Sequence, residues 1–172
     1  FLSRGYGGAL SGPTPVTVDP AVHRAAEVGD EPLLLARVAP TVICADRVEG
    51  ALAAQRLGAE VVVMDDGLQN PALAKDERIA VVDGAVRLGN GLTFPAGPLR
   101  APMAAQWPQV DAVWIVGPGE AGARVAQAAA RAGKQVALGR LVPDPAVVAA
   151  LAGRRLLAFA GIGRPQKFFE TL

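Results

Sequence analysis

The chain has 172 residues, of which 51% are hydrophobic and 19% charged, and its formal net charge is +1. These values fit a globular domain with a sizeable core, and a net charge so close to zero excludes the basic field typical of nucleic-acid-binding proteins. No apolar run approaches the roughly 18 residues that a membrane-spanning helix needs. The single cysteine, Cys44, excludes an internal disulfide, and we interpret it as a small buried hydrophobic residue.

Strand-like and helix-like segments alternate along the chain. Expected strands are 40–45, 60–66, 78–84, 111–117, 134–142 and 155–162, and expected helices are 30–37, 48–58, 119–132, 146–151 and 164–172. Short apolar runs without alternation predict strands that are buried on both faces. Alternation with helices predicts βαβ units. We therefore expect an α/β fold with a mostly parallel sheet flanked by helices. The chain length also allows a second, incomplete lobe.

Two adjacent carboxylates follow an apolar run in "VVVMDDGLQN", residues 61–70. Because Gly67 lets the chain turn, Asp65 and Asp66 could approach one polar site. Mg²⁺ suits such a pair, since it takes one or two carboxylates and completes its shell with waters and phosphate oxygens. An apolar strand that ends in Asp is also the Walker B arrangement of phosphotransferases. The alternative is that the two aspartates only cap a turn.

A second acidic pair lies in "VGDEPLLLAR", residues 28–37. Asp30, followed by Pro32 and a leucine run, is typical of a helix N-cap. Asp30 could equally be a base that accepts a hydroxyl proton, with Glu31 as a partner of Mg²⁺. The two roles are compatible.

Glycine-rich segments supply cations. "SRGYGG", residues 3–8, sets Arg4 and Tyr6 among glycines, and "GNGLTFPAGPLR", residues 89–100, ends in a cation. Glycines let the backbone approach a ligand closely, and an arginine fork suits phosphate. "GPGEAG", residues 117–122, matches a dinucleotide-binding pattern, but the next strand offers Arg140 instead of the acidic residue that this motif requires.

Five motifs in this order resemble the tetraacyldisaccharide 4'-kinase family of lipid A biosynthesis: "SRGYGG", "VGDEPLLLA", "VVMDDGLQ", "GNGLTFPAGPLR" and "FAGIGRPQKFFETL". The resemblance covers essentially the whole chain. It implies a P-loop NTPase-like kinase core, of which residues 1–109 would be part and which would lack its N-terminal phosphate loop here. Residues 110–172 would begin the second lobe.

The resemblance also implies an activity, cofactors and partners. ATP would donate its γ-phosphate, with Mg²⁺, to the 4'-hydroxyl of a tetraacylated glucosamine disaccharide 1-phosphate, the lipid A precursor. The expected location is the cytoplasmic face of the bacterial inner membrane, as a peripheral enzyme that contacts the membrane surface through segments outside this chain. No nucleic-acid partner is expected.

The same resemblance assigns roles to residues. Asp30 would be the base, with Gln69 near the phosphates. Asp65 and Asp66 would organise Mg²⁺, and Glu31 would help to position the Mg²⁺-nucleotide. Contacts to the lipid headgroup are expected from Arg4, Tyr6, Arg47, Asn90 and Arg100.

The chain departs from the family pattern in ways that bear on activity. Leu68 and Asn70 stand where the family usually has Phe and His, and an asparagine cannot become cationic. No stretch matches G-x-x-x-x-G-K-[ST], so we expect an internal piece of a longer protein that transfers no phosphate by itself. The alternatives are a non-catalytic nucleotide- or sugar-binding module and, with less support, a nicotinamide-dependent oxidoreductase.

Overall fold

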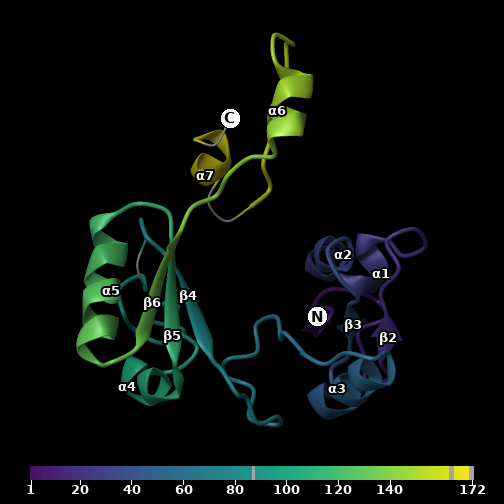
Figure 1. Ribbon diagram of the computed structural model, residues 1–172, viewed down its shortest axis with the longest axis horizontal. Helices are drawn as coiled ribbons and strands as arrows, with labels where there is room; N and C mark the ends of the chain where they lie inside the picture. The colour runs from purple at the N-terminus through teal and green to yellow at the C-terminus, as the bar shows by residue number, and fades with distance from the viewer. Residues whose placement is uncertain (87, 163–164, 171–172) are drawn as a thin grey trace. The chain divides into compact units, whose positions relative to one another are not determined.

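Figure 1 shows the computed structural model, which describes residues 1–86, 88–162 and 165–170. The chain forms two compact units, Phe1–Asp76 and Glu77–Leu172, and each is described by itself below. The expected boundary between residues 109 and 110 concerns the kinase core and a second lobe of the intact protein, and it stays a prediction. Among the described residues, none of the helices combines the length and apolarity that crossing a bilayer requires.

The first unit is built on a three-stranded sheet with the order β1-β3-β2. Its strands are β1 (Leu2–Ser3), β2 (Val16–Thr17) and β3 (Val42–Ile43). Its helices are α1 (Ala25–Val28), α2 (Asp30–Ala36) and α3 (Arg47–Arg56). The central strand β3 runs parallel to β1 and antiparallel to β2.

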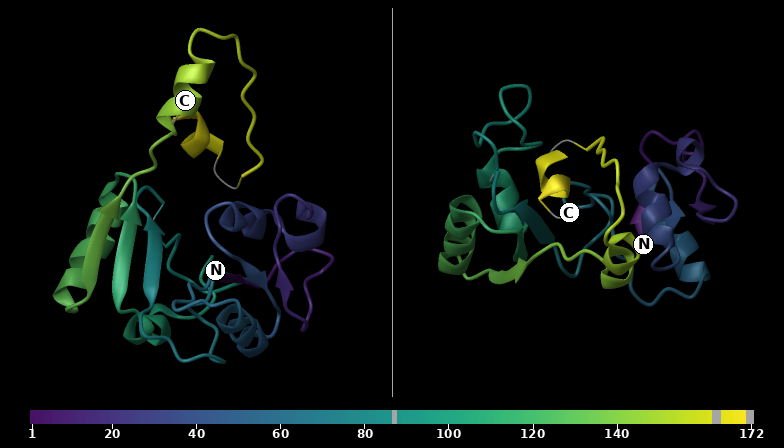
Figure 2. Two further views of the ribbon diagram at one scale, coloured as in Figure 1. Left: turned by 45° about the vertical axis from the view of Figure 1, so that its right-hand side comes forward. Right: turned by 90° about the horizontal axis from the view of Figure 1, so that it is seen from above.

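Helices cover both faces of this first sheet (Figures 1 and 2). Successive residues of a strand point to opposite faces, so Val42 packs in the cluster that includes α3 whereas Ile43 packs in the cluster that includes α2. Gly50 brings α3 close to the sheet, because an added Cβ there would lie 2.5 Å from Cδ1 of Leu2. Cys44 is fully buried in the same cluster, as its apolar surroundings predicted.

The expected strand 60–66 is largely wrong. This segment runs parallel beside β1 but makes only an isolated bridge, between Leu2 and Met64. Burial on both faces is also wrong, because Val61 and Val63 are 77% and 54% exposed. Val62 and Met64 pack against the α3 cluster, so only one side of the segment meets a core in this unit.

The second unit contains a parallel three-stranded sheet, which confirms the predicted α/β class. Its strands, in the order β4-β5-β6, are β4 (Ile79–Asp83), β5 (Ala112–Val116) and β6 (Gln135–Gly139). Its helices are α4 (Met103–Gln106), the 3-10 helix η1 (Trp107–Gln109), α5 (Glu120–Arg131), α6 (Pro145–Leu151) and α7 (Pro165–Phe169).

Helix α5 covers one face of this parallel sheet (Figures 1 and 2). Val113 and Ile115 of β5 are buried, whereas Trp114 between them is 50% exposed. The prediction that these strands are buried on both faces is therefore wrong in this structure. The expected strand 155–162 is also absent, and Leu157 and Phe159 within it are 91% and 84% exposed.

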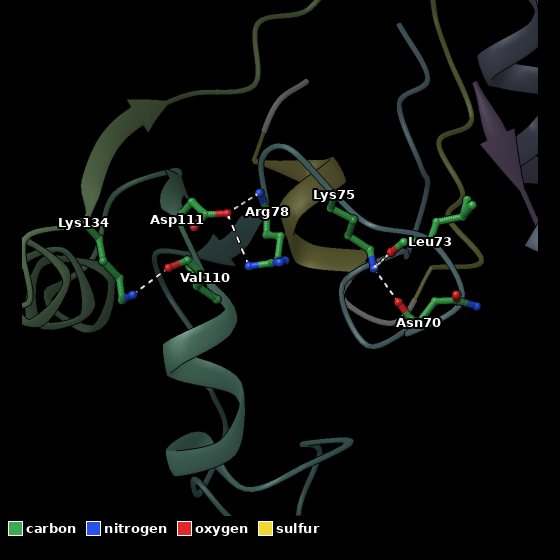
Figure 3. A network of polar contacts seen from close by, with 7 residues as sticks. All are labelled: Asn70, Leu73, Lys75, Arg78, Val110, Asp111 and Lys134. Atoms are coloured by element: carbon green, nitrogen blue, oxygen red, sulfur yellow. Dashed lines mark hydrogen bonds and ion pairs between the residues drawn. The ribbon is translucent and has the colours of Figure 1, made fainter. Parts of the chain in front are cut away.

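Polar side chains connect the amino ends of the three parallel strands (Figure 3). The Asp111 carboxylate, before β5, accepts a 2.9 Å hydrogen bond from the backbone N–H of Arg78, before β4. The guanidinium of Arg78 lies 3.9 Å from the same oxygen. Lys134, before β6, donates to the carbonyl oxygen of Val110 at 2.6 Å. The loops that carry the sequence motifs of this unit follow the opposite, carboxyl ends of the strands.

Candidate functional site

The acid pair stands at a sharp turn directly after the segment that pairs with β1. The backbone N–H of Asp65 donates to the carbonyl oxygen of Leu2 at 3.0 Å, which fixes the first aspartate beside the strand. Asp66 has a φ of +52°, in the left-handed region that non-glycine residues seldom adopt. We expected Gly67 to supply the turn. Gly67 instead allows close packing, because an added Cβ would lie 2.6 Å from Cβ of Met64.

The serine of "SRGYGG" contacts the first aspartate. Ser3 is 3% exposed at the end of β1, and its hydroxyl donates a 3.0 Å hydrogen bond to Oδ2 of Asp65. Arg4 and Tyr6 of this motif were predicted site residues, whereas Ser3 was not. The available signal was its position at the end of a strand, where ligand-contacting residues of parallel sheets gather.

Acidic residues from two distant motifs act on one another. The pKa of Glu31 is raised, first by the charge of Asp65, then by partial burial, and then by the charges of Asp30 and Asp66. A neighbouring negative charge disfavours ionisation, so this shift reports that the four carboxylates share one region. We call Asp30, Glu31, Asp65 and Asp66 the acidic cluster.

Helix α2 positions the first two members of the acidic cluster. The N-cap is Gly29, with a φ of +89°, and Asp30 is the first residue of the helix. The expected capping role of Asp30 is therefore wrong. Its side chain accepts a 3.0 Å hydrogen bond from the backbone N–H of Glu31. Asp30 and Glu31 are both exposed, which leaves their carboxylates accessible to a ligand.

Arginines accompany the acidic cluster. Arg47, the first residue of α3, is only 6% exposed and donates to the carbonyl oxygen of Cys44 at 3.4 Å. Burial and the charge of Arg4 lower the pKa of Arg47, while Asp65 and Asp66 act in the opposite direction. Two predicted headgroup contacts, Arg4 and Arg47, therefore lie near the acid pair.

The remaining predicted site residues of the first unit, Tyr6 and Gln69, follow Arg4 and Asp66 closely in the sequence, and their side chains are exposed. Tyr6 is 85% exposed, and Gln69 is also exposed. Asn70, which replaces the usual histidine of the family, accepts a 2.9 Å hydrogen bond from the backbone N–H of Ala72. The backbone carbonyl oxygen of Asn70 accepts a hydrogen bond from the ammonium group of Lys75. The same ammonium group donates to the backbone carbonyl oxygen of Leu73 at 3.3 Å (Figure 3). Asn70 therefore fixes the loop after the acid pair.

Asn90 and Arg100 belong to the second unit. The side chain of Asn90 donates to the carbonyl oxygen of Ala96 at 2.8 Å and accepts from the backbone N–H of Leu92 at 3.1 Å. Both ends of the amide thus hold the loop 89–100 together. Arg100 is exposed at the end of this loop. Their contact with a substrate stays a prediction.

The dinucleotide-like loop 117–122 packs against its own sheet. The backbone N–H of Gly122, in the first turn of α5, donates to the carbonyl oxygen of Gly84 at 2.9 Å. An added Cβ at Gly122 would lie 2.7 Å from Cα of Gly84, and one at Gly119 would lie 2.3 Å from its carbonyl oxygen. These glycines serve close packing of the chain after β4 against α5.

The donors of the acidic cluster fit Mg²⁺ held together with a nucleotide. Carboxylate oxygens are the hard ligands that Mg²⁺ prefers, and the raised pKa of Glu31 reports negative charge that a cation would relieve. Within the part of the chain that the structure describes, no three His, Cys, Asp or Glu side chains are grouped so as to hold an ion by themselves. Mg²⁺ needs only one or two carboxylates where waters and phosphate oxygens complete its shell.

The α/β fold and this acidic site are together of the kind that phosphotransferases use. A family model supports a more specific assignment: the model described as tetraacyldisaccharide-1-P 4'-kinase matches residues 1–172. The chain belongs to this family, as its five motifs predicted.

Curated relatives match the chain over its full length. It is 63% identical over 172 residues to a tetraacyldisaccharide 4'-kinase of Methylobacterium nodulans, covering 100% of this chain and 50% of the relative. A protein of the same name from a Bradyrhizobium species is 59% identical over 171 residues, covering 99% of this chain and 49% of the relative. The chain thus spans about half the length of the curated relatives that it matches. No solved structure matches it.

Proposed function

We propose that the intact protein containing this chain transfers the γ-phosphate of ATP to the 4'-hydroxyl of a tetraacylated glucosamine disaccharide 1-phosphate. Family membership supports the kinase activity and the lipid disaccharide substrate. The observation that carries the proposal within the structure is the turn after the segment beside β1, where the backbone of Leu2 and the hydroxyl of Ser3 hold Asp65. The raised pKa of Glu31, caused first by Asp65 and also by Asp30 and Asp66, agrees with this placement.

The carboxylates of the acidic cluster divide the work. Asp65 and Asp66 would hold Mg²⁺ and Glu31 would help to position the Mg²⁺-nucleotide, while Asp30 accepts the proton of the attacking hydroxyl. When bound, Mg²⁺ neutralises charge that develops on the transferring phosphate. Gln69 is exposed in the turn after the acid pair, where it would be able to approach the phosphates of a bound nucleotide.

Cations in the glycine-rich segments bind the headgroup of the lipid. Arg4 and Tyr6 belong to an exposed loop of the first unit, where an arginine fork can bind the 1-phosphate of the disaccharide. In the second unit, considered by itself, Asn90 and Arg100 are further candidates for contacts with the headgroup. The burial of Arg47 favours an additional role, as a fixed cation beside Asp65 and Asp66. The reaction takes place at the cytoplasmic face of the inner membrane.

A transfer assay on the intact protein tests the proposal. The protein is incubated with γ-labelled ATP and the tetraacylated disaccharide 1-phosphate, and the label is followed into the lipid. We expect a lipid product labelled at the 4' position, formed only while Mg²⁺ is present and lost on chelation. Binding of either ligand without transfer would support the non-catalytic module instead.

A further inference from the structure

Ser3 is fixed on both sides by the strands around it. Its carbonyl oxygen accepts a 3.0 Å hydrogen bond from the backbone N–H of Cys44, next to β3. On the opposite edge of β1, Leu2 bridges to Met64, so the residues that follow, Ser3 and Asp65, are neighbours in parallel register. The position of the serine hydroxyl is therefore set by the sheet.

The Ser3 hydroxyl has defined partners in this position. It donates to Oδ2 of Asp65 at 3.0 Å, and the backbone N–H of Gly5 approaches its oxygen at 3.5 Å. Ser3 as a whole residue is only 3% exposed, so water has little access to replace these partners. Its hydrogen bond selects one oxygen of the carboxylate and restrains the rotation of the Asp65 side chain. Asp66 stands in a strained turn, so Asp65 is the member of the pair that the strand positions directly.

We propose that Ser3 is a positioning residue for the reaction, and that its hydrogen bond orients the Asp65 carboxylate toward Mg²⁺. The inference rests on the proposed function. Groups that hydrogen-bond to metal ligands typically contribute 10–100-fold to metal affinity, because they fix the ligand before the ion arrives. Ser3 would make this contribution without touching substrate, nucleotide or ion.

Binding of Mg²⁺ to the intact protein tests the inference without measuring turnover. The affinity for Mg²⁺ is measured by calorimetric titration in the presence of a non-hydrolysable ATP analogue. Ser3→Ala should weaken Mg²⁺ binding roughly 10–100-fold, and Ser3→Thr, which keeps the hydroxyl, should restore much of the loss. Ser3→Cys has a similar volume and a weaker donor, so it should give an intermediate affinity.

Ser11→Ala is the matched control. The Ser11 hydroxyl donates to the carbonyl oxygen of Arg4 at 2.9 Å, in the same loop but away from Asp65. This variant should bind Mg²⁺ as the wild type does. Thermal unfolding identifies variants that fail to fold, and if Ser3→Ala is one of them, Ser3→Cys decides.

The outcomes separate the two claims. Suppose that the wild type binds Mg²⁺ in the presence of the analogue and that Ser3→Ala binds it equally well. The role of Ser3 is then overturned, while the proposed function stands. If Ser3→Ala does not fold, the same comparison is made with Ser3→Cys. If the wild type itself binds no Mg²⁺ with the analogue, the proposed function fails, and the inference about Ser3 fails with it.

Discussion

Asp65 raises the pKa of Glu31 more than any other group does, although the two residues belong to different motifs. The relationship joins the first turn of α2 to the turn after the segment beside β1. It shows that folding brings like charges together, which costs free energy unless a cation is present. Such a cost is typical of functional sites.

Replacing Glu31 should change how stability depends on pH. The folded-state pKa of Glu31 lies above the ordinary value of 4.5. The protonated side chain therefore contributes fully to the free energy of unfolding below pH 4.5, and this contribution is lost as pH rises through the raised pKa. Glu31→Gln cannot ionise and should therefore melt at a higher temperature than the wild type at neutral pH. The gain should disappear below pH 4.5.

Salt and a matched variant check the cause of this effect. Glu31 is exposed, so the gain should be small and should shrink as ionic strength rises. Glu60→Gln, at an exposed position that is not among the groups acting on Glu31, should show no such pH-dependent gain. Equal pH profiles for both variants in thermal unfolding would contradict the electrostatic account.

Asp30 should matter for turnover and little for stability. The N-cap of α2 is Gly29, so Asp30→Ala removes a favourable first-turn charge, worth about 0.3–1 kcal/mol, together with the hydrogen bond from the backbone N–H of Glu31. It also relieves repulsion between Asp30 and Glu31, so the net change in stability should be small. As the proposed base, its removal should lower the transfer rate of the intact protein by roughly 10²–10⁴-fold. Steady-state kinetics and denaturant unfolding measure the two effects separately.

Asp46 provides the opposite case. Its side chain accepts hydrogen bonds from the backbone N–H groups of Val48 and Glu49, so it is the true N-cap of α3. Asp46→Ala should cost about 1 kcal/mol of stability and leave the transfer rate within a few-fold of the wild type. An Asp30→Ala protein that is destabilised but fully active would make Asp30 merely structural.

Close packing at Gly50 should be intolerant of a methyl group. A Cβ there would lie 2.5 Å from Cδ1 of Leu2 and 2.9 Å from Cβ of Cys44, both fully buried. Gly50→Ala should therefore cost about 1–3 kcal/mol, as overpacked cores do, although alanine favours helices by about 1 kcal/mol. Denaturant unfolding measures the change.

The control for Gly50 is Gly12. A Cβ at that position would meet only the carbonyl oxygen of Leu10, at 4.0 Å, so Gly12→Ala should stay within about 0.5 kcal/mol of the wild type. A net stabilisation by Gly50→Ala would show that helix propensity outweighs the contact between α3 and the sheet.

Local patterns in the sequence predicted the parallel sheet well. The apolar runs that became β4, β5 and β6 are bounded by turns, and the alanine-rich segment that became α5 has helical spacing. The sequence of an apolar run does not reveal which other elements pack against its faces. The same reasoning therefore wrongly predicted two buried faces for β5 and a strand at 155–162. Such features depend on tertiary partners.

The site was predictable in its residue types but only partly in its geometry. Adjacent carboxylates after an apolar run indicated a cation, and the motifs assigned Glu31 and Asp65 to the same proposed site, in agreement with the effect of Asp65 on the pKa of Glu31. The left-handed turn at Asp66 and the hydrogen bond from Ser3 depend on the parallel register of Leu2 with Met64. Register between distant segments is not visible in either segment alone.

The central claim is that Asp65 and Asp66 hold Mg²⁺ beside a bound nucleotide, and a Mg²⁺ titration of the intact protein with a non-hydrolysable ATP analogue tests it most directly. We expect Mg²⁺ binding that is lost in Asp65→Asn and in Asp66→Asn but retained in Asp76→Asn, an exposed aspartate of the same unit. Mg²⁺ binding of equal affinity in the wild type and in both variants of the acid pair would contradict the account.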